Sequence, residues 1–93
     1  MPAPAKPRVL VVDDETPIRS IVRAAVESSG GVALEAATAA HALELARTER
    51  PALVILDLGL PDLDGADVCR TIRQWSSVPI LVLSARHSDA EKV

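Results

Sequence analysis

Acidic side chains and one hydroxyl follow three short apolar runs of the sequence. Asp13, Asp14 and Glu15 follow the run at residues 9–12. Asp57 follows the run at 53–56, and Ser84 follows the run at 80–83. In an open parallel sheet, ligands bind beyond the carboxyl ends of the strands. If the three runs are parallel strands, we expect these oxygen-bearing side chains to converge at one edge of a sheet.

Three carboxylates brought together need compensation. Two carboxylates about 5 Å apart repel each other by about 3 kcal/mol at an effective dielectric constant near 20. Such a cluster requires raised pKa values or a bound cation, and no cationic residue in the sequence is obviously placed to neutralise it. Oxygen ligands suit Mg²⁺, which keeps waters that a phosphate can replace. A carboxylate beside such an ion can attack a phosphoryl group, so the residues predict metal-dependent phosphoryl transfer onto a carboxylate, with Asp57 as the central candidate.

The elements that must position these groups can be predicted from the hydrophobic pattern. The runs at 9–12, 53–56 and 80–83 are apolar at consecutive positions, which is typical of strands covered on both faces. A shorter, weaker strand is expected at 32–36. Helical patterns separate the four strands. The chain therefore predicts an α/β fold, an open parallel sheet with helices on both faces and right-handed crossovers.

Capping residues set the expected limits of the helices. Thr16 can cap the first helix with Pro17 at its first position, and Gly30 ends it. Thr38 opens a second helix, which Pro51 stops. The third helix is expected to run to about residue 75, and the capping-box spacing at 88–91 predicts the beginning of another.

The loop before the third helix contains further acidic residues. Asp62, Asp64 and Gly65 do not match a calcium-binding loop, because residue 60, where the first ligand would stand, is a leucine. We interpret these three residues as shaping the turn, with Asp64 as the helix cap.

Composition limits the class of protein. The 93 residues, 48% hydrophobic and 25% charged, are enough for one domain, and the formal charge is −3. That charge and the lack of a basic stripe argue against direct nucleic-acid binding by this segment. Cys69 is the single cysteine, which suits a reducing compartment and predicts a cytoplasmic location. No apolar run is long enough for a membrane span. Residues 1–7 are expected to form a flexible arm before a domain at 8–93.

Each candidate residue also has a purely structural interpretation. Asp13 and Asp14 could cap the first helix, since carboxylates favour helix N-termini. Asp57 could be an ordinary residue of the turn after a strand, and Ser84 a structural hydroxyl at a strand end. Only their combination favours the metal and phosphoryl interpretation.

Three segments in this order resemble one family. RVLVVDDE at 8–15, PALVILDLGLPDLDG at 51–65 and VPILVLSAR at 78–86 are similar to the receiver domain of bacterial two-component response regulators. Residues 57–65, 75–79 and 84–86 are most similar to the winged-helix transcription-factor branch, and within it to regulators of Kdp-type potassium uptake. The resemblance implies a flavodoxin-like sheet with strand order 2-1-3-4.

The resemblance also implies a role for each matching residue. Asp57 matches the phosphoacceptor, which receives its phosphoryl group from a sensor histidine kinase. Ser84 matches the hydroxyl that moves to bond the phosphoryl group, and Ala85 supplies a backbone N–H to it. The implied Mg²⁺ ligands are Asp13, Asp14, the carboxylate of Asp57 and the backbone carbonyl of Gly59.

One part of the family pattern has no match here. Receivers also use a lysine at the end of a fifth strand, and Lys92 is not that lysine, because it falls at the expected beginning of a fourth helix. We therefore expect an incomplete receiver over 8–93 that lacks the fifth strand and last helices. Its output would lie in a DNA-binding domain outside the chain. The strand at 80–83 would be an exposed edge, which favours a homodimer or a swapped partner chain.

Two other functions remain open from the residues. The chain could be a truncated receiver that acts only as a metal-binding or interaction module. It could also be an aspartyl-nucleophile phosphatase, but such enzymes need a second acid two residues after the nucleophile, and Gly59 stands there. We therefore expect a signalling module and no dedicated turnover enzyme.

Overall fold

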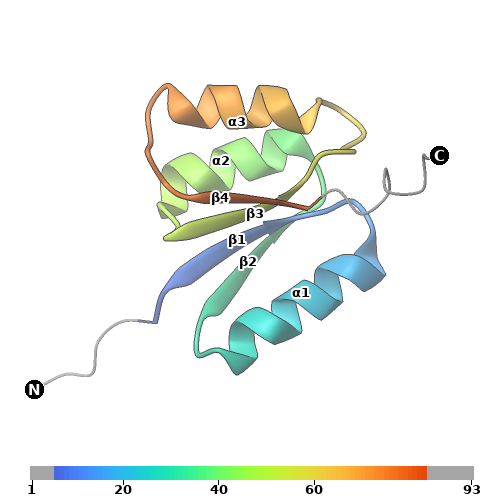
Figure 1. Cartoon of the computed structure of the whole chain (residues 1–93), viewed down its shortest axis with the longest axis vertical. Coiled ribbons are helices and arrows are strands. Elements are labelled where there is room, and N and C mark those ends of the chain that lie inside the picture. Colours follow the sequence, from blue (N-terminus) through green and yellow to red (C-terminus); the bar gives the residue numbers. More distant parts are fainter. Residues whose placement is uncertain (1–5, 84–93) are drawn as a thin grey trace, which may run out of the picture.

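Four parallel strands and three helices alternate along the chain. A computed structural model of the protein describes residues 6–83. The elements are β1 (Arg8–Val12), α1 (Thr16–Ser28), β2 (Val32–Ala36), α2 (Ala39–Glu49), β3 (Leu53–Asp57), α3 (Gly65–Arg73) and β4 (Ile80–Leu83). Figure 1 shows the layers: α1 covers one face of the sheet, and α2 and α3 lie together on the other.

The strands lie in the order β2-β1-β3-β4, and every neighbouring pair is parallel. This order confirms the α/β fold and the 2-1-3-4 arrangement expected from the sequence. The chain reverses its direction of winding beside β1 and β3, which are neighbours in the middle of the sheet. Open parallel sheets bind ligands at such a switch point.

Side chains of successive strand residues point to opposite faces of the sheet, where they pack into two hydrophobic cores. Leu10, Val12, Val54 and Leu56 pack under α2 and α3 in the larger core. The smaller core, under α1, contains Val9, Val11 and Val26, with Leu53 and Ile55 packed against it. The consecutive apolar residues of β1 and β3 are therefore explained by helices on both faces.

The predicted strands are confirmed, with Arg8 added to the first and Asp57 to the third. Two helix limits differ from the sequence prediction. Glu15, in an extended conformation, occupies the N-cap of α1, and no side chain caps the helix, so Thr16 was the wrong cap. Thr16 lies instead within the helix, because the turn that leads into it is closed one residue earlier, where the Glu15 amide donates to Asp13 Oδ1. The third helix ends at Arg73, short of residue 75.

Within residues 6–83, β4 is the exposed edge that the sequence predicted, but it is not covered on both faces as its apolar pattern suggested. In the described part of the chain β4 is an edge strand with one neighbour, β3. Leu81 is 52% exposed and Val82 is 41% exposed. The consecutive apolar residues of β4 therefore predicted the strand correctly, but among residues 6–83 they are not covered on both faces. The helix expected to begin near residue 88 lies outside the described residues.

Candidate functional site

The ends of β1 and β3 bring three carboxylates together. Val12 pairs with Leu56 in the register of these two strands, so Asp13, directly after β1, and Asp57, the last residue of β3, lie side by side. Oxygen atoms of Asp13, Asp14 and Asp57 all lie within 4.8 Å of one another. The sequence-predicted cluster is therefore assembled by strand pairing, although Asp57 lies far along the chain from the other two.

The two carboxylates at the centre of the cluster are enclosed. Asp13 and Asp57 are each only 6% exposed, whereas Asp14 is exposed. Backbone amides hold both central side chains: the amide of Glu15 donates to Asp13 Oδ1 at 2.8 Å, and the amide of Gly59 donates to Asp57 Oδ1 at 3.3 Å. These bonds orient the two carboxylates at the edge of the sheet.

The electrostatics of the cluster favour a cation. Burial raises the pKa of Asp13, and the negative charges of Asp57 and Asp14 raise it further, against the Glu15 amide hydrogen bond, which lowers it. Coulomb's law gives about 3 kcal/mol of repulsion for two charges at this separation and an effective dielectric constant near 20. A hard divalent cation with oxygen ligands would relieve this repulsion, and the three carboxylates fit that requirement.

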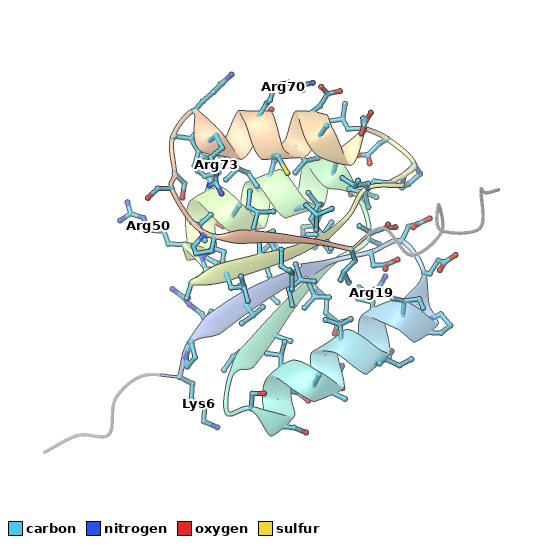
Figure 2. All side chains as sticks on the ribbon, in the orientation of Figure 1. Lys6, Arg19, Arg50, Arg70 and Arg73 are labelled. Atoms are coloured by element: carbon cyan, nitrogen blue, oxygen red, sulfur yellow. The ribbon has the colours of Figure 1, made fainter. Side chains whose placement is uncertain are left out.

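A cationic residue that the sequence interpretation missed lies at this edge. Arg19 of α1 donates from its Nη1 to the backbone carbonyl of Asp13 at 2.7 Å and from its Nε to Glu35 at 3.0 Å. Figure 2 shows Arg19 near the start of α1, at the end of the sheet where the acidic side chains gather. The sequence signal that could have indicated this contact is the position of Arg19, six residues after Asp13 in an amphipathic helix. The guanidinium contacts the Asp13 main chain and fixes the β1–α1 turn.

The loop after Asp57 is held by contacts that anchor it on both sides. The amide of Gly65 donates to the carbonyl of Leu58, and a Cβ added at Gly65 would lie 2.7 Å from Leu58 Cα. Asp64 caps α3 by accepting from the amide of Ala66, as predicted. Asp62 does more than shape the turn, because its carboxylate accepts from the first two amides of α2.

Of the remaining predicted site residues, Gly59 lies within the described part of the chain, and two others do not. Gly59 lies next to Asp57 through the amide hydrogen bond, while the expected role of its carbonyl as a metal ligand stays a prediction. Ser84 and Ala85 lie outside the described residues. Leu83, directly before Ser84 in the chain, pairs with Asp57 in the β3–β4 register.

The comparison with known protein families decides the assignment. The model of the response regulator receiver domain matches residues 9–93. The chain belongs to this family. The fold of the receiver domain, with strand order β2-β1-β3-β4 and acidic residues at the ends of β1 and β3, agrees with that membership.

Curated relatives of this receiver domain are transcriptional regulators. The chain is 49% identical over 85 residues to the KDP operon transcriptional regulatory protein KdpE of Escherichia coli K12, covering 91% of this chain and 38% of the relative. It is 45% identical to the KdpE protein of Mycobacterium tuberculosis H37Rv with the same coverage. The chain thus spans about two fifths of the length of these relatives.

Solved structures agree with the fold. A response regulator receiver protein from Pseudomonas putida superimposes with a TM-score of 0.80 at 34% identity, covering 88% of this chain and 70% of that one. A CheY-like receiver domain from Methanospirillum hungatei gives a TM-score of 0.85 at 26% identity, with coverage of 90% and 68%. Within residues 6–83 of the receiver domain, no helix has the length and apolar character to span a membrane.

Proposed function

We propose that this receiver domain accepts a phosphoryl group on Asp57 from the phosphohistidine of a sensor histidine kinase, with Mg²⁺ bound at the site. The observation that carries the proposal is the convergence of Asp13, Asp14 and Asp57 oxygens within 4.8 Å at the switch point of the sheet. The family match supports it, because receivers are the signalling modules of response regulators.

The proposed phosphoryl transfer forms one bond to phosphorus and breaks another. A carboxylate oxygen of Asp57 attacks phosphorus, an O–P bond forms and the N–P bond of the phosphohistidine breaks. The leaving imidazole keeps the electron pair and takes a proton from solvent. The Gly59 amide holds the attacking carboxylate in place through its bond to Asp57 Oδ1. The reaction exchanges one phosphoryl bond for another, so no second acid is required.

The proposed metal ligands are the carboxylates of Asp13, Asp14 and Asp57 together with the Gly59 carbonyl. A bound Mg²⁺ would offset the charge that develops on the phosphoryl oxygens. The burial of Asp13 and Asp57 supports this role, because enclosed carboxylates are usually paired or bound to a metal. Ser84 and Ala85 are proposed to contact the phosphoryl oxygens, which rests on the family resemblance.

The wider role of the protein follows from its relatives. Since these are named as transcriptional regulators, we extend the proposal to control of transcription through a DNA-binding domain outside this chain. The chain itself is proposed to be a switch and no turnover enzyme. The cytoplasmic location, the arm at 1–7 and the domain at 8–93 stay predictions.

The deciding experiment is the intact mass of the chain after incubation with acetyl phosphate, with and without Mg²⁺. We expect the mass to rise by one phosphoryl group in the presence of Mg²⁺ and to stay unchanged in Asp57→Asn. Glu44→Gln, an exposed carboxylate of α2 away from the cluster, is the matched control and should be modified normally. Circular dichroism verifies that each sample is folded.

The outcomes separate the alternatives. Modification without Mg²⁺, or modification of Asp57→Asn, would contradict the proposed chemistry. A folded chain that gains no phosphoryl group would be a metal-binding or interaction module. Sustained hydrolysis of p-nitrophenyl phosphate would instead favour the phosphatase.

We also propose that the chain self-associates along β4. In the described sheet β4 is an edge strand, in which Leu81 is 52% exposed and Val82 is 41% exposed, and Ile21 of α1 is 66% exposed. Exposed apolar residues at a sheet edge favour pairing with another chain. Sedimentation equilibrium should show dimers that dissociate in Leu81→Lys, whereas a monomer at high concentration would refute the proposal.

A further inference from the structure

A cavity lies at the end of the sheet opposite the acidic cluster. It is partly open to solvent and has a volume of about 630 Å³ between the end of α2 and the segment that follows α3. The lining residues are Ala46, Arg47, Arg50, Pro51, Trp75 and Ser76. Pro51 precedes β3 and Ser76 precedes β4, so the cavity opens beside the amino ends of strands whose carboxyl ends face the cluster. In Figure 2, Arg50 lies at the end of the molecule away from Arg19.

The cavity carries uncompensated positive charge. Among residues 6–83, the other arginines each make an ion pair or a side-chain hydrogen bond: Arg8, Arg19, Arg23, Arg70 and Arg73. Arg47 and Arg50 make neither within this part of the chain. Glu49, their neighbour in sequence, is held by Arg8 at 3.0 Å, and no carboxylate lines the cavity. Two guanidinium groups are therefore available to an anion.

The backbone at Arg50 adds a second observation. Arg50 has a φ of 48°, in the left-handed region, where glycine and asparagine are favoured and a long side chain is disfavoured. Among the described residues other than glycine, it is the one with a positive φ. This conformation is the left-handed C-cap that ends α2, and it places Arg50 at the wall of the cavity.

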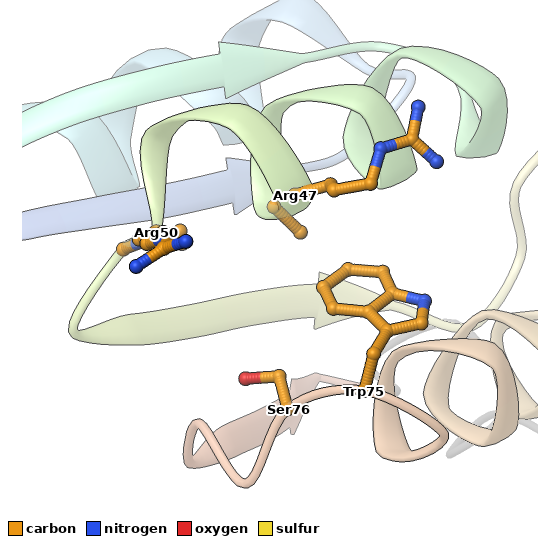
Figure 3. A pocket seen from close by; sticks show the side chains of 6 residues that line it. Arg47, Arg50, Trp75 and Ser76 are labelled. Atoms are coloured by element: carbon orange, nitrogen blue, oxygen red, sulfur yellow. The ribbon is translucent and has the colours of Figure 1, made fainter.

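An indole face completes the lining. Trp75 is 42% exposed, and it is the chain's one aromatic residue, since the sequence has no Tyr or Phe. Figure 3 shows its ring in the space between α2 and the segment after α3, with the Arg47 and Arg50 guanidinium groups on either side in this view. Ala46 and Pro51, both buried, supply an apolar wall. Planar rings stack on such an indole, and guanidinium groups bind phosphate through paired N–H donors.

We propose that this cavity binds a nucleoside monophosphate, with the base stacked on Trp75 and the phosphate held by Arg47 and Arg50, whose exposed side chains would turn toward each other on binding. Its volume is in the range of small-molecule sites, which is about 300–1,000 Å³. The proposal goes beyond phosphoryl transfer at Asp57 and does not depend on it, because the two sites share no residue. Ser76 can donate its hydroxyl proton to the ligand while its oxygen accepts from the amide of Val78.

The fluorescence of Trp75 gives a direct test, because no other tryptophan contributes to the signal. AMP titrated into the chain, excited at the red edge of the indole absorption, should quench the emission saturably. Adenosine supplies the ring without the anion, and ribose 5-phosphate supplies the anion without the ring. Each should bind about tenfold or more weakly than AMP, because each loses one of the two interactions.

Variants locate the site. Arg47→Gln and Arg50→Gly should each weaken AMP binding about tenfold, and the glycine also suits the left-handed backbone, so that variant remains folded. Arg70→Gln, on the exposed face of α3 and paired with Asp67, is the matched control and should bind normally. Isothermal titration of Trp75→Leu should show a comparable loss.

Several results would overturn the proposal. The first is the absence of saturable quenching at AMP concentrations up to about five times a Kd of 1 mM. The second is that adenosine binds as tightly as AMP. The third is that Arg70→Gln weakens AMP binding as much as Arg50→Gly does. Asp57→Asn should bind AMP like the unmodified chain, so failure at one site is distinguishable from failure at the other.

Discussion

The Oδ1 atom of Asp62 accepts a hydrogen bond from the backbone amide of Ala39 at 2.8 Å, across 23 positions of the sequence. Its other oxygen accepts from the amide of Ala40 at 3.0 Å. The first amides of a helix have no partner within the helix, and the helix dipole favours an anion there. The loop that follows Asp57 is thereby fastened to the N-terminus of α2, which sits beside the site.

Removing this contact should make the protein less stable and change its pH dependence. The amides of Ala39 and Ala40 lower the pKa of Asp62, so its contribution to stability is complete above the pKa of the unfolded chain, about 4. That contribution is lost as the pH falls through the lower folded-state pKa. We expect Asp62→Ala to lower the Tm at pH 7 and to flatten the loss of Tm on acidification. Asp62→Asn, which keeps one acceptor oxygen, should lie between the two. An unchanged Tm in both variants would refute the capping role.

Gly65 should not tolerate a side chain. A Cβ there would lie 2.7 Å from Leu58 Cα and from Leu58 Cδ2, and the backbone atom cannot move without displacing the loop after Asp57. We expect Gly65→Ala to reduce the free energy of unfolding by about 2 kcal/mol, typical of overpacking, measured by urea denaturation. Gly30→Asn is the control, because it adds its side chain in open space at a φ of 92° that asparagine tolerates better than other residues. Equal effects of the two substitutions would contradict the steric explanation.

Neutralising Asp13 should stabilise the metal-free chain. Its replacement by asparagine would keep the Oδ1 that accepts from the Glu15 amide but remove a buried charge that Asp57 and Asp14 repel. We expect Asp13→Asn to raise the free energy of unfolding by about 1 kcal/mol in EDTA. This is a fraction of the unscreened repulsion between the carboxylates, because Asp14 is exposed and solvent screens its charge. Under the proposed function, Mg²⁺ should stabilise the parent chain more than the variant. A variant that is less stable than the parent in EDTA would show that the cluster is not under electrostatic strain.

Arg19 should contribute more to stability than its neighbour Arg23. The Arg19 side chain is 17% exposed and joins Glu35 to the Asp13 carbonyl, whereas that of Arg23 is 50% exposed and also pairs with Glu35. We expect Arg19→Met to cost about 1–2 kcal/mol, because it removes the donor to the partly buried Asp13 carbonyl and one of the two partners of Glu35. Arg23→Met should cost less, as exposed ion pairs do. Chemical denaturation of the two variants under the same conditions measures the difference, and a larger loss in Arg23→Met would reverse the assignment.

Much of the fold was predictable because its signals are local. Consecutive apolar residues at 9–12 and 53–56 indicate strands buried on both faces, and the helical periodicity between them requires crossover connections. The acidic site followed from the same logic, because parallel strands end at one edge and carry Asp13 and Asp57 with them. Thr16 shows the limit of a local signal: a threonine before a proline is a plausible cap, but the Asp13–Glu15 hydrogen bond closes the turn one residue earlier.

The sequence by itself determined the order of strands and helices, the clustering of carboxylates and the family to which the chain belongs. The tertiary structure alone decided which side chains meet across those elements: Asp62 with the start of α2, Arg19 with the Asp13 carbonyl, and Trp75 with Arg47 and Arg50 in one cavity. Hydrophobic periodicity sets the face that an element buries, because it depends on neighbours along the chain. It does not set the rotation and crossing of two packed elements, on which contacts between distant residues depend.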